Sequence, residues 1–242
     1  LLARAAALRQ RLVSARLTKY NFADPIARPA SATGRRLILV PAQVPGDASL
    51  RFGALTVEGN LGLLRAVRNE NPDAHIVYKV HPDIASGNRP GSDDRAAAAS
   101  LADQVTAEGD MASWLEIVDE VHVATSLAGF EALLRGRRVV TWGLPFYAGW
   151  SLTDDRVAAP RRGRTLTLDA LVAGALILYP RYADPVSRIP CSAEDAIEML
   201  IARRLARPLA SPRGHRLARR LRRQARSTAI IALEFTRGWQ GH

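Results

Sequence analysis

Short apolar runs alternate with segments of helical pattern along most of this chain, and this alternation restricts the possible folds more than any other feature. Residues 37–40 form a continuous apolar run, which is typical of a strand buried on both faces. The same reasoning predicts further strands at residues 75–80, 120–124 and 138–142, and helices at residues 59–69, 96–109, 111–118, 127–134, 167–178 and 192–205. Such alternation indicates a parallel sheet covered by helices. We therefore expect an α/β fold, with a Rossmann-like parallel sheet and helices on both faces.

The chain divides into three predicted parts. Residues 1–34 begin with an amphipathic helix and continue through turn-forming residues, so we expect a linking helix and a connection. Residues 35–205 form the Rossmann-like domain. Residues 206–242 form a basic C-terminal tail, because eleven arginines fall in the last forty residues of a chain whose net charge is +11. Such a tail is either solvated or disordered, or a basic amphipathic segment that lies on an anionic membrane surface.

The composition limits the class of protein and its compartment. A chain of 242 residues, of which 48% are hydrophobic, is long enough to bury one sizeable core. Cys191 is the only cysteine, which excludes an intramolecular disulfide and a zinc site of clustered thiolates. With a single cysteine, the cytoplasm is the expected compartment, and the sequence shows neither an apolar run of membrane-spanning length nor a signal-peptide pattern. Because the first residue is Leu1 rather than methionine, we also expect a fragment that lacks its upstream part.

Polar side chains gather where the predicted strands end. In an open parallel sheet, ligands bind outside the carboxyl ends of the strands, so these groups are expected to share one cleft. The candidate substrate-binding and catalytic residues, in chain order, are Gln43, Asp47, Ser49, Lys79, His81, Pro82, Ser126, Glu131, Gly143, Tyr147 and Trp150. The last three belong to an aromatic, glycine-containing loop at residues 141–155, which we expect to line the cleft.

The second of these strand ends suggests a phosphate site. Lys79 and His81 alternate to one side of a strand, and Pro82 ends its hydrogen-bonded ladder. A single histidine after a strand is usually structural. The chain has only two lysines among its many arginines, however, and this favours a functional Lys79.

Two further candidates each have a structural alternative. Ser126 begins a predicted helix, where serine is a common N-cap, but a helix N-terminus that points into a cleft also binds phosphate. Glu131 is placed to accept hydrogen bonds from a ribose diol, or it is an ordinary solvent-facing helix residue. Asp47 lies in the sequence Pro-Gly-Asp, which is good turn chemistry, although a carboxylate at a strand end also serves as a nucleophile in a retaining glycosyl transfer. Asp83 and Asp154 are alternative nucleophiles.

Several sequence blocks together resemble the KpsC-type capsular polysaccharide biosynthesis proteins over about residues 8–202. The blocks are Lys19-Tyr20-Asn21, Gln43-Val44, Asp47-Ala48-Ser49, Arg51-Phe52-Gly53, Tyr78-Lys79, His81-Pro82-Asp83, Gly87, Ala124-Thr125-Ser126, Gly129 to Leu133, Gly143, Pro145 to Trp150, Tyr179-Pro180, Tyr182, Asp184-Pro185 and Pro190-Cys191. This resemblance implies a β-Kdo glycosyltransferase that moves the acidic sugar Kdo, with retention, from CMP-Kdo to a lipid-linked poly-Kdo linker. It also implies the GT-B fold, of which this chain would be one half, with residues 35–205 as the nucleotide-sugar-binding domain.

The resemblance also assigns roles to residues and partners. It implies that Asp47 is the nucleophile. It also implies that Lys79, His81 and Ser126 lie on the side of the CMP phosphate and the Kdo carboxylate, and that Glu131 lies at the ribose. It implies a nucleotide-sugar donor, a glycolipid acceptor, an upstream acceptor-side domain or second module, and a place at the inner face of the cytoplasmic membrane. No cofactor or metal is expected, because CMP carries a single phosphate and the chain has no compelling Asp-x-Asp pattern. One departure is Ser151, where the family usually has glycine.

Two other classes of function compete with this assignment. The first is a non-catalytic binding or scaffold module in capsule assembly or export, although the presence of Asp47 and His81 argues against it. The second is a nucleic-acid-binding protein that uses the basic tail. We do not expect nucleic-acid binding, because aromatic residues are not interleaved with the tail arginines as a base-stacking surface requires.

Overall fold

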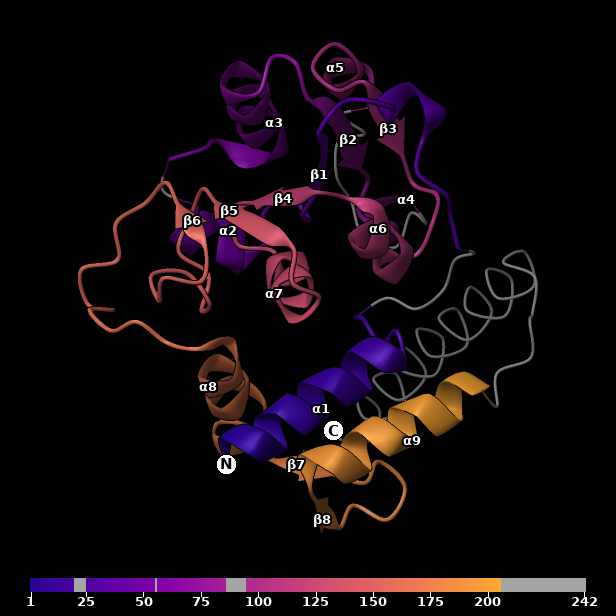
Figure 1. Ribbon diagram of the computed structural model, residues 1–242, viewed down its shortest axis with the longest axis vertical. Helices are drawn as coiled ribbons and strands as arrows, with labels where there is room; N and C mark the ends of the chain where they lie inside the picture. Colours follow the sequence, from indigo (N-terminus) through magenta and orange to yellow (C-terminus); the bar gives the residue numbers. More distant parts are fainter. Residues whose placement is uncertain (20–24, 55, 86–94, 206–242) are drawn as a thin grey trace, which may run out of the picture. The chain divides into compact units, whose positions relative to one another are not determined.

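The computed structural model describes residues 1–19, 25–54, 56–85 and 95–205 (Figure 1). Residues 1–197 form one compact unit, and residues 198–205 are the described part of a second unit. The predicted basic tail, residues 206–242, lies outside the described residues. The predicted domain boundaries at residues 34 and 205 stay predictions.

A six-stranded parallel sheet forms the centre of the first unit, which confirms the predicted α/β, Rossmann-like fold. The strand order is β3-β2-β1-β4-β5-β6, and every neighbouring pair is parallel. The strands are β1 (Leu37–Pro41), β2 (His75–Lys79), β3 (Gln104–Thr106), β4 (Glu120–Val123), β5 (Arg138–Thr141) and β6 (Asp154–Asp155). The order reverses between β1 and β4, and this switch point is where sheets of this type open a crevice for ligands.

Both faces of the sheet are buried, as the continuous apolar strands predicted. Along β1, Leu37 and Leu39 face one core with α6 (Met111–Ile117) and α7 (Leu127–Leu134). Ile38 and Val40 face the other, with α3 (Gly59–Glu70) and α5 (Arg95–Ala99). Figure 1 shows α3 and α5 on one side of the sheet and α6 and α7 on the other. The alternation of side chains along a strand therefore divides the apolar residues between two cores.

Two short strands of the parallel sheet, β3 and β6, were not predicted. The predicted helix at residues 96–109 is α5 followed by turns and the edge strand β3, so the prediction was wrong over residues 100–109. Strand β6 consists of two aspartates that pair with β5. The remaining helices of the sheet region are α2 (Ala48–Gly53) and α4 (Pro82–Ala85).

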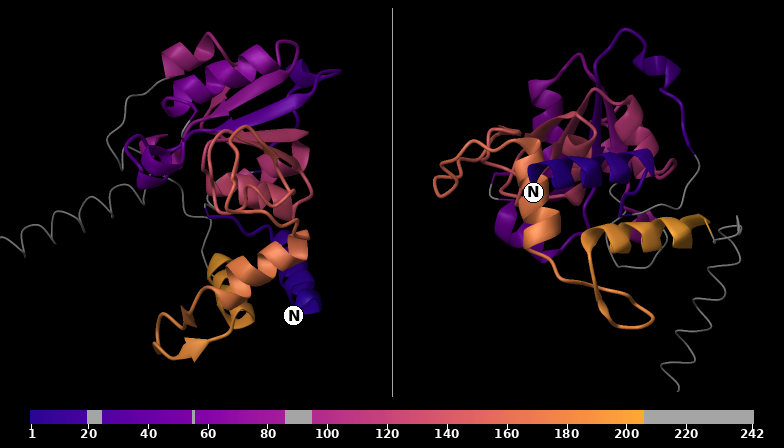
Figure 2. Two further views of the ribbon diagram at one scale, coloured as in Figure 1. Left: turned by 90° about the vertical axis from the view of Figure 1, so that its left-hand side faces the viewer. Right: turned by 60° about the horizontal axis from the view of Figure 1, so that its bottom comes forward.

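The helices at residues 2–14 and 168–178 contribute side chains to the first of these cores. Helix α1 (Leu2–Ser14) buries Ala5 and Leu8 and contacts α8 (Leu168–Val172), which continues as a π-helical turn (Ala173–Leu178). After it come a short 2-stranded antiparallel sheet, β7 (Tyr182–Ala183) with β8 (Pro190–Cys191), and α9 (Ala193–Leu205) (Figure 2). Within the described ranges, no helix combines the length and the apolar character needed to cross a bilayer.

Candidate functional site

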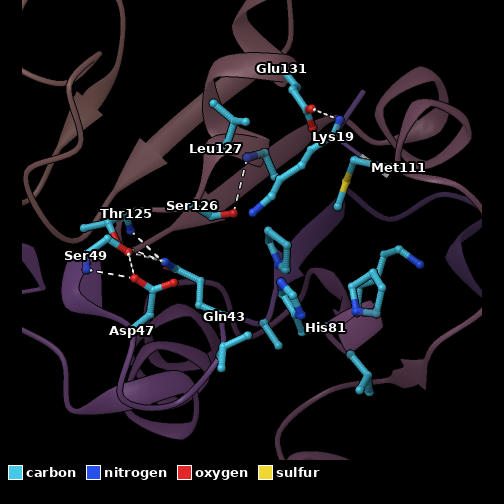
Figure 3. Close-up of a pocket in the computed structure, with 17 residues that line it drawn as sticks. Lys19, Gln43, Asp47, Ser49, His81, Met111, Thr125, Ser126, Leu127 and Glu131 are labelled. Atoms are coloured by element: carbon cyan, nitrogen blue, oxygen red, sulfur yellow. Dashed lines mark hydrogen bonds between the residues drawn. The ribbon is translucent and has the colours of Figure 1, made fainter. Parts of the chain in front are cut away.

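A cavity of about 220 Å³ lies at the switch point between β1 and β4 (Figure 3). Eight of the predicted site residues line it: Gln43, Asp47, Ser49, Lys79, His81, Pro82, Ser126 and Glu131. They come from the β1–α2 connection and the first turn of α2, from the end of β2 and the residues after it, and from α7 with its N-cap. The structure therefore brings together polar groups that are spread over almost ninety positions of the sequence.

Gln43 joins the two strands that flank the switch point. Its Nε2 donates to Thr125 Oγ1 at 2.9 Å, and the Thr125 backbone N–H donates to its Oε1 at 3.0 Å. The side chain of Asn60 is hydrogen-bonded to both the N–H and the C=O of Gln43. Because the side-chain amide is engaged on both its atoms, the observed role of Gln43 is to fix the end of β1 against the end of β4.

The carboxylate of Asp47 is oriented by the first turn of α2. Asp47 is the N-cap of this helix, and its Oδ1 accepts hydrogen bonds from the Ser49 N–H at 3.0 Å and the Ser49 hydroxyl at 3.1 Å. Gly46 precedes it with a φ of +77°, so the predicted turn is present. The turn and the carboxylate's place at the cavity coexist, and Ser49 holds the carboxylate in position.

His81 has one ring nitrogen with a defined role. The Asp83 backbone N–H donates to His81 Nδ1 at 3.1 Å, so Nδ1 acts as an acceptor. A neutral imidazole that accepts at Nδ1 carries its proton at Nε2, which makes Nε2 a hydrogen-bond donor. Pro82 begins α4, a position that suits proline because no helical N–H is lost there.

Lys79 lines the cavity but uses its ammonium group elsewhere. Its Nζ donates to the carbonyl oxygens of Glu108 and Gly109, both at 2.8 Å, and lies 3.5 Å from that of Ala107. The residue is 4% exposed, and burial lowers the pKa of the ammonium to about 8, against an opposing effect of Asp110. A phosphate contact would require the ammonium to leave these acceptors, and its observed role is to hold the loop between β3 and α6.

The start of α7 forms one side of the cavity. Ser126 is the N-cap of this helix, and its hydroxyl accepts a hydrogen bond from the Ala128 N–H at 3.3 Å. The structural interpretation of Ser126 is thus confirmed. The helix N-terminus opens on the cavity, since Ser126, Leu127 and Ala128 all line it. A ligand phosphate at this helix end stays a prediction.

Glu131 is buried at 8% exposure, so its interpretation as an ordinary solvent-facing residue was wrong. Its Oε1 accepts a hydrogen bond from the Lys19 backbone N–H at 2.7 Å. Burial raises the pKa of this carboxyl group, while the hydrogen bond from Lys19 and the nearby charges of Arg135 and Lys19 lower it. Its predicted contact with a ribose stays a prediction.

The aromatic loop supports the cavity from outside, since Gly143, Tyr147 and Trp150 are not among the residues that line it. Tyr147 is fully buried and donates its hydroxyl hydrogen to the Ser126 carbonyl. At Gly143, a β-carbon would lie 2.4 Å from the Gly53 carbonyl oxygen, so only glycine allows this close approach of α2 to the end of β5. Gly143 and Tyr147, which the sequence placed in the cleft, instead help to fix the elements that form it.

The lining residues that were not among the predicted site residues include Lys19, Met111 and Thr125. Lys19 follows α1 and enters from a segment that the predicted organisation assigned to a connection. Its rarity as one of two lysines was the signal that could have identified it. Neither of the alternative nucleophiles, Asp83 and Asp154, lines the cavity. Within the part of the chain that the structure describes, no group of three or more His, Cys, Asp or Glu side chains is arranged to hold a metal ion.

Comparison with known proteins decides the family. Residues 2–182 match the capsule polysaccharide biosynthesis protein family. The chain belongs to this family. Among its relatives, the capsule polysaccharide modification protein LipA of Neisseria meningitidis is 47% identical over 197 residues, which are 81% of this chain and 28% of LipA. The lipopolysaccharide-processing protein LpsZ of Rhizobium meliloti is 41% identical over 179 residues, which are 74% of this chain and 40% of LpsZ.

Solved structures extend the similarity to the fold. The β Kdo 2,7 transferase of Thermosulfurimonas dismutans KpsC superposes with a TM-score of 0.70 at 38% identity, over 84% of this chain and 62% of that one. The β Kdo 2,4 transferase of the same KpsC gives a TM-score of 0.71 at 32% identity, over 83% and 62%. The predicted resemblance to KpsC-type proteins is confirmed. The chain spans less than two thirds of each of these relatives.

Proposed function

We propose that this chain is the donor-binding portion of a β-Kdo glycosyltransferase of capsule biosynthesis, which transfers Kdo with retention from CMP-Kdo to a lipid-linked acceptor. The observation that carries this proposal is the cavity at the switch point, where a carboxylate (Asp47), a donor imidazole (His81) and a helix N-terminus (Ser126) meet. The similarity to two solved Kdo transferases supports the same activity.

The donor's phosphate is bound between His81 Nε2 and the N-terminus of α7. A helix N-terminus stabilises an anion through its unpaired N–H groups and its dipole, so this site requires no metal ion. The cytidine ribose lies against Glu131, whose second carboxylate oxygen accepts hydrogen bonds from its hydroxyl groups. The contacts of the phosphate with His81 and with the N-terminus of α7 also stabilise the negative charge that develops on the phosphate as it leaves.

Retention of configuration follows from two displacements at the anomeric carbon of Kdo. In the first, a carboxylate oxygen of Asp47 forms a bond to this carbon, and the bond to the phosphate oxygen breaks, so CMP leaves with the electron pair. In the second, the acceptor hydroxyl loses its proton to a base and bonds to the same carbon, and the carboxylate of Asp47 is released. Asp47 is preferred over Asp83 and Asp154 because it alone of the three lines the cavity.

The acceptor is a glycolipid, and the chain acts as one half of a GT-B enzyme. An upstream acceptor-side domain or second module faces the cavity, and the assembly works in the cytoplasm at the inner face of the membrane. The chain covers 62% of the solved β Kdo 2,7 transferase chain, so part of that structure has no counterpart in this sequence.

Calorimetric titration of the chain with CMP, UMP and AMP tests the proposal. We expect CMP to bind more tightly than the other two nucleotides, and we expect Asp47→Asn to leave CMP binding in place because the carboxylate acts on the sugar. A correctly folded chain that binds no nucleotide, or all three equally, would refute a CMP-selective donor site and would favour a scaffold module.

Intact-mass spectrometry tests the nucleophile. After incubation with CMP-Kdo, the wild-type chain and Asp83→Asn are expected to carry a covalent Kdo adduct that Asp47→Asn lacks. An adduct on Asp47→Asn that maps to another carboxylate would show that the nucleophile is misassigned.

A further inference from the structure

The segment formed by residues 17–19 is attached to α7 by two side chains one helical turn apart. Glu131 Oε1 accepts a hydrogen bond from the Lys19 N–H at 2.7 Å, and Arg135 Nη2 donates to the Leu17 carbonyl at 3.1 Å. Arg135 Nη1 also donates to the Glu131 carbonyl at 3.0 Å. These contacts fix the backbone of the 17–19 segment on both sides of Thr18.

A third attachment joins the same segment to α6. Arg16 donates to Ser113 Oγ at 2.7 Å and to Glu116 Oε2 at 2.6 Å. Arg16 has a φ of +52°, an uncommon conformation for a residue other than glycine, and its side-chain contacts stabilise it. The path of the chain from α1 to Lys19 is therefore set by α6 and α7, whose N-termini both reach the cavity through Met111 and Ser126.

This anchoring directs one side chain into the site. Lys19 lines the cavity, and Figure 3 shows its side chain extending from the contact with Glu131 toward Ser126 at the start of α7. The other lysine of the cavity, Lys79, is 4% exposed and donates to backbone carbonyls of the loop after β3. Lys19 is exposed and lines the cavity, so a ligand in the cavity can contact its side chain.

We infer that Lys19 is a phosphate-binding residue of this site, which acts together with the N-terminus of α7 to select a phosphorylated nucleoside over the nucleoside itself. The inference rests on the proposed function, and it assigns to Lys19 the phosphate contact that the sequence assigned to Lys79. Glu131 and Arg135 are positioning residues for it, because they hold the backbone that carries the ammonium group. A charge-assisted hydrogen bond to phosphate is among the stronger polar contacts in proteins.

The test compares CMP with cytidine by calorimetry in the wild type, Lys19→Ala and Arg65→Ala. Arg65 is an exposed cation on α3 that does not line the cavity, so Arg65→Ala matches the loss of one positive charge. We expect Lys19→Ala to weaken CMP binding about tenfold and to leave cytidine binding unchanged, so that the ratio of the two affinities falls. Arg65→Ala should keep the wild-type ratio.

The possible failures are distinguishable. If the wild type binds CMP and Lys19→Ala keeps the wild-type ratio of CMP to cytidine affinity, the inference about Lys19 is wrong and the proposed function stands. If Lys19→Ala weakens CMP and cytidine equally, Lys19 shapes the cavity and does not bind phosphate, which also overturns the inference. A folded wild type that binds no CMP would overturn the proposed function and the inference together.

Discussion

Gly129→Ala tests the packing that supports the cavity. Gly129 lies in α7, and a β-carbon added there would be 2.3 Å from Tyr147 Oη, 2.8 Å from Cζ and 2.9 Å from Cε2. Tyr147 is 0% exposed, its hydroxyl is bonded to the Ser126 carbonyl, and its ring packs edge-on against Phe146 at 5.2 Å between centroids. The ring therefore has no room to move away without breaking the contact at the start of α7.

Two opposing contributions to the free energy of unfolding decide whether Gly129→Ala stabilises or destabilises the protein. Replacing glycine by alanine within a helix stabilises it by roughly 0.5–1 kcal/mol. Overpacking of a dense core costs roughly 1–3 kcal/mol, and a contact of 2.3 Å lies at the severe end. We expect a net loss of about 2–2.5 kcal/mol, which for a unit of this size lowers the melting temperature by roughly 4–10 °C.

Thermal unfolding followed by circular dichroism measures this loss. Gly174→Ala is the matched control, because Gly174 is also helical and a β-carbon there would meet no atom within 4 Å. The control should melt at or above the wild-type temperature. If Gly129→Ala melts at or above the wild-type temperature, Tyr147 does not pack against α7 as described here.

Two further predictions concern charged side chains that are held by hydrogen bonds, Lys79 and Asp103. Lys79→Met should lower the free energy of unfolding, measured by denaturant titration, by about 1–3 kcal/mol, because it leaves the carbonyls of residues 107–109 without their donor. The control is Lys19→Met at the exposed lysine, which should leave the free energy of unfolding nearly unchanged. At Asp103, burial raises the pKa, but the N–H of Ile76 and the guanidinium groups of Arg68 and Arg35 outweigh it and lower the pKa from 3.8 to about 2. A lowered carboxyl pKa stabilises the folded state above the unfolded value and loses this effect as the pH falls. Denaturant titrations should therefore show that Asp103→Asn is less stable than the wild type at pH 7, and that the difference shrinks between about pH 4 and pH 2; a difference independent of pH would contradict this assignment.

The central strands could be predicted because a strand that is buried on both faces has a continuous run of apolar residues. Residues 37–40 carry it, and β1 lies where the sequence placed it. The edge strand β3 has only half-buried residues, and β6 consists of two aspartates, so neither shows the apolar run that identifies a central strand. These strands form through pairing with β2 and β5, a tertiary effect that local pattern does not report.

The candidate site was predictable in outline and not in its contacts. Strand ends converge by topology, which is why Asp47, His81 and Ser126 could be grouped from the sequence. The partners of Lys79 come from the loop after β3, whose path depends on a strand that was not predicted. From the sequence, Glu131 was expected either to contact a ribose or to face solvent. Helix α7 is buried on all sides from Ala128 to Leu134, and this burial depends on the elements packed around the helix.

A crystal structure of the protein with bound CMP tests the central claim most directly. The proposed site predicts that the phosphate lies between His81 Nε2 and the N-terminus of α7, with the ribose toward Glu131. An empty cavity in crystals saturated with CMP, or CMP bound outside the cavity at the β1–β4 switch point, would contradict the assignment of this site to the donor.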